Sequence, residues 1–191
     1  MKKIAIAALL SAAVAAPAFA ADNGFYVGVD VGRSSTGNPY PGIPMTKSSD
    51  TVGGIFAGYQ FTKNWGAEVF YTGAGKFAAT SATGITGNGK ADVWGLVGTG
   101  TLPLSDAFSL YGKLGYASAK TTTSIPAGFA LTGATRGAAT YGLGAVYNVT
   151  PAVGIRLGWD RYAAATQSGT VLGAKDNFNV NVYSLGATYK F

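Results

Sequence analysis

The sequence has no cysteine and no histidine among its 191 residues. Without cysteine, the chain can form neither a disulfide framework nor a thiolate metal site. Without histidine, it lacks the side chain that most often transfers protons in enzymes. The sequence also has no glycine-rich phosphate loop and no metal-ligand spacing. We therefore expect no enzymatic activity and no cofactor.

Charged residues are also scarce. They make up 12% of the chain, about half of the roughly 25% that is typical of soluble proteins. The 14 Lys and Arg exceed the 8 Asp and Glu, but they are scattered singly, without the basic runs typical of nucleic-acid binders. Nucleic acid is therefore not an expected partner. Low charge together with 29 glycines and many aromatic residues favours a β-barrel in a membrane.

The first 20 residues have the three parts of a secretory signal peptide. Two lysines precede an apolar stretch that begins at Ile4, and residues 18–20, Ala-Phe-Ala, form a small-x-small cleavage site. A membrane-spanning helix is the alternative, but residues 4–20 are short for one and contain Pro17. We predict residues 1–20 as a Sec signal peptide and residues 21–191 as one outer-membrane barrel domain. Removal of the signal peptide lowers the net charge from +6 to +4.

The strand pattern is clearest at the end of the sequence. From Asn181 to Phe191 every second residue belongs to one set, apolar apart from Asn181, while the residues between them are mostly polar. A period of two indicates a strand with two unlike faces. Six residues rise about 20 Å along a strand, so aromatic pairs six apart would form two girdles flanking an apolar band. Such pairs are Trp65 and Tyr71, Tyr141 and Tyr147, and Tyr183 and Tyr189.

We predict an all-β fold, an eight-stranded antiparallel up-and-down transmembrane β-barrel. The expected strands are 25–33, 52–61, 65–73, 93–102, 108–117, 140–149, 152–160 and 181–191. Tight turns at 62–64, 103–107 and 150–151 alternate with long loops at 34–51, 74–92, 118–139 and 161–180. This alternation is typical of outer-membrane barrels with their short turns in the periplasm. An even number of strands places both termini in the periplasm as well.

The two faces of these strands differ in charge. The phase with the aromatic pairs carries no charge, whereas the other carries Asp30, Glu68, Lys113, Arg156, Asp160 and Lys190 among Gly, Ser and Thr. A charge facing lipid at the bilayer midplane costs about 2–4 kcal/mol, so the charged phase is expected to line the lumen. A soluble, lipocalin-like barrel is the alternative, but its outer face would need a denser coat of charges.

An eight-stranded barrel has an interior only wide enough for side chains to fill it. Glycines at many lumenal positions would leave room for the ionic and aromatic side chains beside them. We expect Glu68 to pair with Arg156 or Lys113, and Asp30 or Asp160 to neutralise the remaining cation, because buried charges persist only when paired. The lumen should then be plugged.

Several segments resemble the transmembrane domain of outer-membrane protein A. They are Gly58-Tyr59-Gln60, residues 66–71 and 110–115, Val149-Thr150-Pro151 with Ile155-Arg156-Leu157, and residues 184–191. The resemblance implies a lumenal pair of Glu68 with Arg156 and a lumenal cation at Lys113. It does not carry over that family's proposed ion gate, because Thr99, Gly158 and Asp30 replace a lysine, a glutamate and a basic residue. The family's periplasmic peptidoglycan-binding domain is not expected after Phe191.

The last strand also resembles the signal that barrel-assembly machinery recognises, with Tyr189 and a terminal Phe191 at alternating positions. That machinery is therefore an expected partner during biogenesis.

Basic residues near the upper strand ends and in the long loops predict lipopolysaccharide as a further partner. They are Arg33, Lys47, Lys76, Lys90, Lys120, Arg136 and Lys175, opposed by Asp50, Asp92 and Asp176. A basic side chain near an anionic membrane surface gains about 1 kcal/mol. The favoured function is a structural barrel that supports envelope integrity and lipopolysaccharide packing. The alternatives are an adhesin that binds a host or cell-surface ligand through its loops, and a narrow, gated ion pore.

Overall fold

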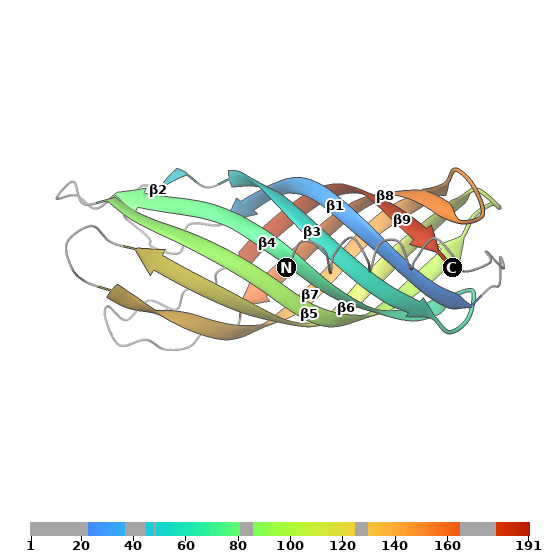
Figure 1. Cartoon of the computed structure of the whole chain (residues 1–191), viewed down its shortest axis with the longest axis horizontal. Helices are drawn as coiled ribbons and strands as arrows, with labels where there is room; N and C mark the ends of the chain where they lie inside the picture. The colour runs from blue at the N-terminus through green and yellow to red at the C-terminus, as the bar shows by residue number, and fades with distance from the viewer. Residues whose placement is uncertain (1–22, 37–44, 48, 81–85, 125–129, 165–178) are drawn as a thin grey trace, which may run out of the picture.

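The computed structural model describes residues 23–36, 45–47, 49–80, 86–124, 130–164 and 179–191. All regular structure in these residues is β-strand (Figure 1). The strands are β1 (Gly24–Thr36), β2 (Met45–Lys47), β3 (Ser49–Gln60), β4 (Trp65–Thr80), β5 (Thr86–Pro103), β6 (Phe108–Ser124), β7 (Ala130–Asn148), β8 (Val153–Ala164) and β9 (Asn179–Lys190). In the described residues, no helix has the length and apolar character needed to cross a membrane.

Eight of these strands close into a barrel in which every neighbouring pair is antiparallel. The order around the wall is β1, β3, β4, β5, β6, β7, β8 and β9. The first and last of these strands pair with each other from Tyr26 opposite Lys190 to Thr36 opposite Val180, so the sheet has no open edge in the barrel wall. The predicted eight-stranded up-and-down barrel is confirmed. The short β2 lies against the far end of β4.

The strands are longer at the long-loop end than the sequence predicted. The three short turns lie where expected and are closed by hydrogen bonds such as that from the Phe61 amide to the Trp65 carbonyl, 2.9 Å. By contrast, most of the predicted loops 74–92 and 118–139 is strand, and β5 and β6 stay paired as far as Asn88 opposite Ser124. These Thr-, Ala- and Gly-rich segments have weak alternation, but the neighbouring strand satisfies their backbone groups. Figure 1 shows β4 to β7 extending beyond β1, β8 and β9 at this end.

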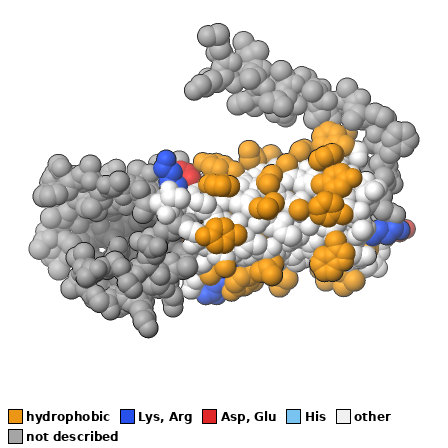
Figure 2. Space-filling view, turned by 90° about the horizontal axis from the view of Figure 1, so that it is seen from below, with side chains coloured by type: hydrophobic (Ala, Val, Ile, Leu, Met, Phe, Trp, Pro, Cys, Tyr) orange, Lys and Arg blue, Asp and Glu red, His pale blue; other side chains and the backbone are white. Residues whose placement is uncertain are grey.

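The outer face of the barrel is apolar, as predicted. Trp65 and Leu114, which point outward, are 67% and 69% exposed, whereas the intervening phase points into the lumen. Outward aromatic rings contact one another near both ends of this face: Phe25 and Tyr59 lie 4.7 Å apart at the short-turn end, and Tyr141 and Trp159 lie 6.0 Å apart toward the long loops. Figure 2 shows this hydrophobic band with charged side chains only near its ends. A lipocalin-like barrel, with its apolar face inside, is excluded.

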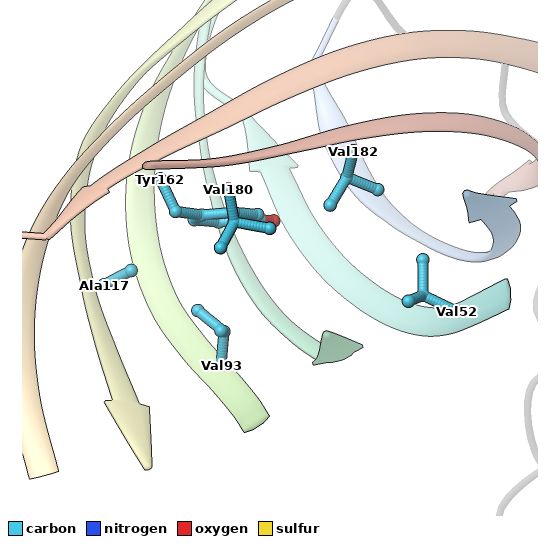
Figure 3. Close-up of a cluster of buried hydrophobic side chains, with 6 residues drawn as sticks. All are labelled: Val52, Val93, Ala117, Tyr162, Val180 and Val182. Carbon is cyan, nitrogen blue, oxygen red and sulfur yellow. The ribbon is translucent and has the colours of Figure 1, made fainter. Parts of the chain in front are cut away.

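The lumen contains an apolar layer near the long-loop end, which we call the septum. It consists of Val52, Val93, Ala117, Tyr162, Val180 and Val182, all buried, with Phe70 and Ala119 packed against them (Figure 3). The septum side chains come from β3, β5, β6, β8 and β9 and converge inside the barrel. This layer is not part of the predicted lumen, for which we expected aromatic and charged side chains alone.

Candidate functional site in the barrel lumen

An ion cluster lies in the lumen on the short-turn side of the septum. Glu68 is on β4, Lys113 is on β6, and Arg156 and Asp160 are on β8, all in the inward phase of their strands. In the closed barrel β4 and β8 are four strands apart in either direction, so they form opposite walls. An interaction between Glu68 and Arg156 therefore crosses the full width of the lumen.

Glu68 is the centre of this cluster, and its side chain is 1% exposed. The guanidinium of Arg156 binds it at two points, with 2.6 Å between Nη1 and Oε2 and 3.4 Å between Nη2 and Oε1. Lys113 Nζ lies 2.8 Å from Asp160 Oδ1 and 3.7 Å from Glu68 Oε1. Lys113 thus joins the two carboxylates, and Asp160 supplies its closer anionic partner.

Aromatic side chains surround the buried charges. The Arg156 guanidinium lies over the rings of Phe56 and Tyr111, at 4.5 Å and 4.2 Å from their centroids. The Tyr26 hydroxyl donates to Glu68 Oε2 at 3.1 Å, and the Tyr111 hydroxyl donates to the Leu157 carbonyl at 3.2 Å. Cation–π contacts and hydrogen bonds of this kind offset part of the cost of removing charge from water.

Glycines on adjacent strands make the space that these side chains occupy. A Cβ on Gly58 would lie 2.3 Å from the Tyr26 ring, and one on Gly144 would lie 2.4 Å from the Tyr111 ring. A Cβ on Gly142 would collide with Asp160 Oδ1 at 2.3 Å. Real Cβ atoms do not approach so closely. The predicted role of lumenal glycine, to make room for ionic and aromatic neighbours, is confirmed at these positions.

The structure brings together four of the five lumenal charges singled out in the sequence. The fifth, Asp30, also points inward, but it makes no ion pair with another described residue. Its carboxylate occupies the space beside Gly54, where a Cβ would lie 2.6 Å from Asp30 Oδ1 and 3.0 Å from the Thr72 hydroxyl. Lys190, the sixth charge that the sequence predicts in the inward phase, is exposed at the short-turn rim.

The cluster can cross-link the barrel walls, since its charged groups are directed at one another. A cavity of about 610 Å³ opens at the short-turn end, and its lining includes Tyr26, Thr99 and Arg156. The septum lies on the long-loop side of the cluster. Among the described residues, no three potential metal-ligating His, Cys, Asp or Glu side chains come together.

The family described as the outer membrane protein beta-barrel domain matches residues 6–191. This chain belongs to that family. The protein is therefore a β-barrel of the bacterial outer membrane, and the apolar band is its lipid-facing surface. No curated protein sequence matches the chain.

Solved outer-membrane barrels share this fold at low sequence identity. Neisserial surface protein A is 20% identical with a TM-score of 0.61, covering 88% of this chain and 97% of its own. OprG from Pseudomonas aeruginosa is 19% identical with a TM-score of 0.59, covering 90% and 96%. Ail, the attachment invasion locus protein of Yersinia pestis, is 17% identical with a TM-score of 0.52, covering 88% and 99%.

The structure describes the side chains of only some residues of the predicted basic rim. Arg33 and Lys120 are exposed on the outer face, and Lys120 lies opposite Asp92 in the register. The register locates Lys47, Lys76, Lys90 and Arg136 on β2, β4, β5 and β7, where only the backbone is described. Lys175 and Asp176 lie outside the described residues, and Asp50 is in the inward phase of β3.

Arg161 is a rim residue outside the predicted basic set. It lies on β8 in the same outward phase as Leu157 and Trp159, two positions nearer the long loops than Trp159. The predicted strand ended at Asp160, so Arg161 was assigned to a loop. The outward alternation of β8 was the signal that could have identified it.

The two residues of the expected assembly signal lie at the seam where the barrel closes. Tyr189 pairs with Val27, and the Phe191 amide donates to the Phe25 carbonyl at 3.0 Å. The rings of Tyr189 and Phe191 meet edge to face at 5.1 Å. Both belong to the aromatic girdle of the short-turn end.

Proposed function

We propose that this protein is a non-enzymatic structural barrel that supports the integrity of the outer membrane and the packing of its lipopolysaccharide. The observation that carries the proposal is the doubly closed lumen. The ion cluster joins opposite walls through Glu68 and Arg156, and the septum adds a separate apolar layer. A barrel closed in this way is a rigid, lipid-facing body and not a channel for solutes, which argues against the gated-pore alternative.

The proposal includes a route to the membrane. Residues 1–20 direct Sec export, the barrel-assembly machinery recognises the strand that ends with Tyr189 and Phe191, and both termini face the periplasm. The beginning of β1 and the end of β9 lie side by side at the short-turn rim, which supports a common location for the termini. A protease added to intact cells should then leave both ends of the mature chain uncut.

The structural role is tested in a strain that lacks the gene for this protein and receives one of two replacement genes. One gene encodes the natural chain, and the other replaces residues 81–85 and 125–129 with short Gly-Ser links. The strain without the protein should admit more of a hydrophobic dye, and both genes should restore the barrier. If the deletion leaves dye uptake unchanged, the structural role is refuted.

A second candidate function is adhesion to an anionic polysaccharide at the cell surface. Ail was solved in complex with the heparin analogue sucrose octasulfate. The present chain exposes Arg33 and Lys120 toward the long-loop end of the barrel. In the strains above, heparin binding that is lost when Arg33 and Lys120 are both replaced by Gln would support adhesion. Equal heparin binding by strains with and without the protein would refute the adhesion function.

A further inference from the structure

The outer wall of the barrel carries a shallow apolar groove of about 800 Å³. Its floor follows one row of outward residues that are neighbours in the register across five strands: Leu110, Ala145, Leu157, Leu185 and Val31. Ala145 is the smallest of these side chains and lies between leucines, so the surface is lowest there. We call this depression the outer groove.

Two arginines lie directly above the outer groove, toward the long loops. The next row of the register contains Trp159, Tyr183 and Arg33, and Arg161 lies opposite Asn181 one row higher. Strands are about 4.8 Å apart and rise about 3.3 Å per residue, which places the Cα atoms of the two arginines about 12 Å apart. Two extended arginine side chains can close that gap around a single phosphate group.

No acidic side chain neutralises this pair of arginines. The outward positions of β1, β7, β8 and β9 hold no Asp or Glu within the described residues. Arg33 Nη2 donates to the Ser49 hydroxyl at 3.0 Å, which leaves its other N–H groups for a ligand. Arg161 forms no ion pair in the described part of the chain. Lys120, on the same rim, differs because Asp92 lies opposite it.

We propose that Arg33, Arg161 and the outer groove form a binding site for one phosphorylated, acylated lipid of the lipid A class. The arginines hold a phosphate by paired N–H donors, Trp159 and Tyr183 lie at the membrane interface, and an acyl chain lies in the groove over Leu157 and Leu185. The occupant is a lipid because the site joins a cationic end to an apolar groove that faces the membrane. This inference rests on the proposed role in lipopolysaccharide packing.

The test places the full barrel in bilayers of lipid A and phosphatidylcholine and releases it in a native mass spectrometer. The measured quantity is the fraction of barrels that retain bound lipid A. Arg33→Gln and Arg161→Gln should each lower the apparent affinity about fivefold, the gain expected for one basic side chain at an anionic membrane surface. The double variant should lose about 25-fold. Lys120→Gln is the matched control, since it removes one cation from the same rim outside the groove, and it should change the affinity less than twofold.

The groove is tested with two further reagents. Ala145→Phe should fill the floor of the groove and weaken lipid A binding, and the deacylated, diphosphorylated headgroup should bind the unmodified barrel at least tenfold more weakly than lipid A does. Inorganic phosphate serves as the probe for binding to the arginines alone. Equal binding of the headgroup and lipid A would overturn the groove as an acyl site.

The outcomes separate this site from the broader role. If the unmodified barrel retains no lipid A, both the site and the packing role are refuted. If the barrel retains lipid A and the double variant retains it equally, or Lys120→Gln loses as much as Arg161→Gln, only the site is refuted. All variants are checked for folding by their shift on gels with and without boiling. A glutamine variant that fails to fold is replaced by Arg→Lys, which keeps the charge but loses the paired donors and should retain lipid A only in part.

Discussion

Glu68 depends on partners from several strands. Its nearly inaccessible carboxylate accepts from Arg156 and Tyr26 and lies near Lys113. A charge in this position persists only while it is paired, since an isolated buried charge is strongly destabilising. The cluster therefore makes the barrel sensitive to loss of one member and less sensitive to loss of both members of a pair.

Arg156→Ala should lower the free energy of unfolding by about 3–5 kcal/mol, because it leaves Glu68 buried without its main partner. Glu68→Ala should cost a similar amount, and the double variant should cost less than the sum of the two. Urea unfolding in lipid vesicles, followed by tryptophan fluorescence, measures all three. Lys190→Ala removes an exposed lumenal cation and should have little effect. Strictly additive costs would show that the two side chains do not interact.

Gly144→Ala tests the space made by lumenal glycine. The new Cβ would lie 2.2 Å from the Leu157 carbonyl oxygen and 2.4 Å from the Tyr111 ring, so the wall or the ring must move. Overpacking of this kind costs about 1–3 kcal/mol. At Gly112, which faces outward, the nearest atom to a new Cβ is Leu143 Cδ2 at 3.6 Å, so Gly112→Ala should be tolerated. Equal urea midpoints for the two variants would contradict the steric argument.

Strand β9 completes the barrel by pairing with β8 and β1. Its outward side chains face lipid, and its last residues reach the short-turn rim. The amide of Phe191 extends the pairing with β1 by one hydrogen bond, 3.0 Å to the Phe25 carbonyl. The end of β9 is thus both a structural seam and the proposed assembly signal.

Phe191→Ala should slow insertion of the barrel in cells and leave refolding in detergent intact. The reason is that the assembly machinery recognises the Phe191 ring, whereas the hydrogen bond to the Phe25 carbonyl is made by the Phe191 backbone amide. The measurement is the fraction of chain in the membrane whose gel migration changes on boiling. Phe61→Ala removes another exposed aromatic from the same rim and should not slow insertion. Equal delays in the two variants would show that β9 carries no special signal.

The barrel wall is closed around its circumference. Each strand of the wall is paired on both sides, so no edge is available for SDS to open at room temperature. Along the axis, the ion cluster and the septum occupy the lumen at two separate levels, which supports the proposal that it is closed to solutes. Both kinds of closure lead to predictions about the intact protein.

The folded protein should resist SDS at room temperature and unfold on boiling. Because unfolding breaks the ladder all around the wall, it should occur as a single transition. Gel migration with and without boiling measures it, and identical migration of refolded samples would count against a closed barrel.

The unmodified barrel should show no steady, large conductance in planar bilayers at neutral pH. An apolar constriction excludes ions by excluding water, so Glu68→Ala with Arg156→Ala should leave the barrel closed at the septum. Val52→Ser with Val182→Ser should leave it closed at the ion cluster. Conductance should appear only when all four substitutions are combined. Steady conductance from the unmodified protein would favour the pore alternative.

The two faces of each strand follow from the sequence, because side chains alternate with a period of two wherever the backbone is extended. That local rule placed Glu68, Lys113, Arg156 and Asp160 in the lumen and the aromatic girdles outside. The same rule located the short turns. The strand ends toward the long loops could not be predicted in this way, since the weakly alternating residues 118–124 become strand only by pairing with β5 and β7.

The pairing of the lumenal charges depends on the tertiary structure. Their heights depend on the register between strands and on the closure of β1 on β9, which are properties of the whole wall. That geometry paired Glu68 with Arg156 across the lumen and Lys113 with Asp160, and it left Asp30 beside Gly54. It also gathered valines from separate strands into the septum and set Arg161 near Arg33 on the outer surface. No local pattern contains these contacts, because each joins residues that are far apart in the chain.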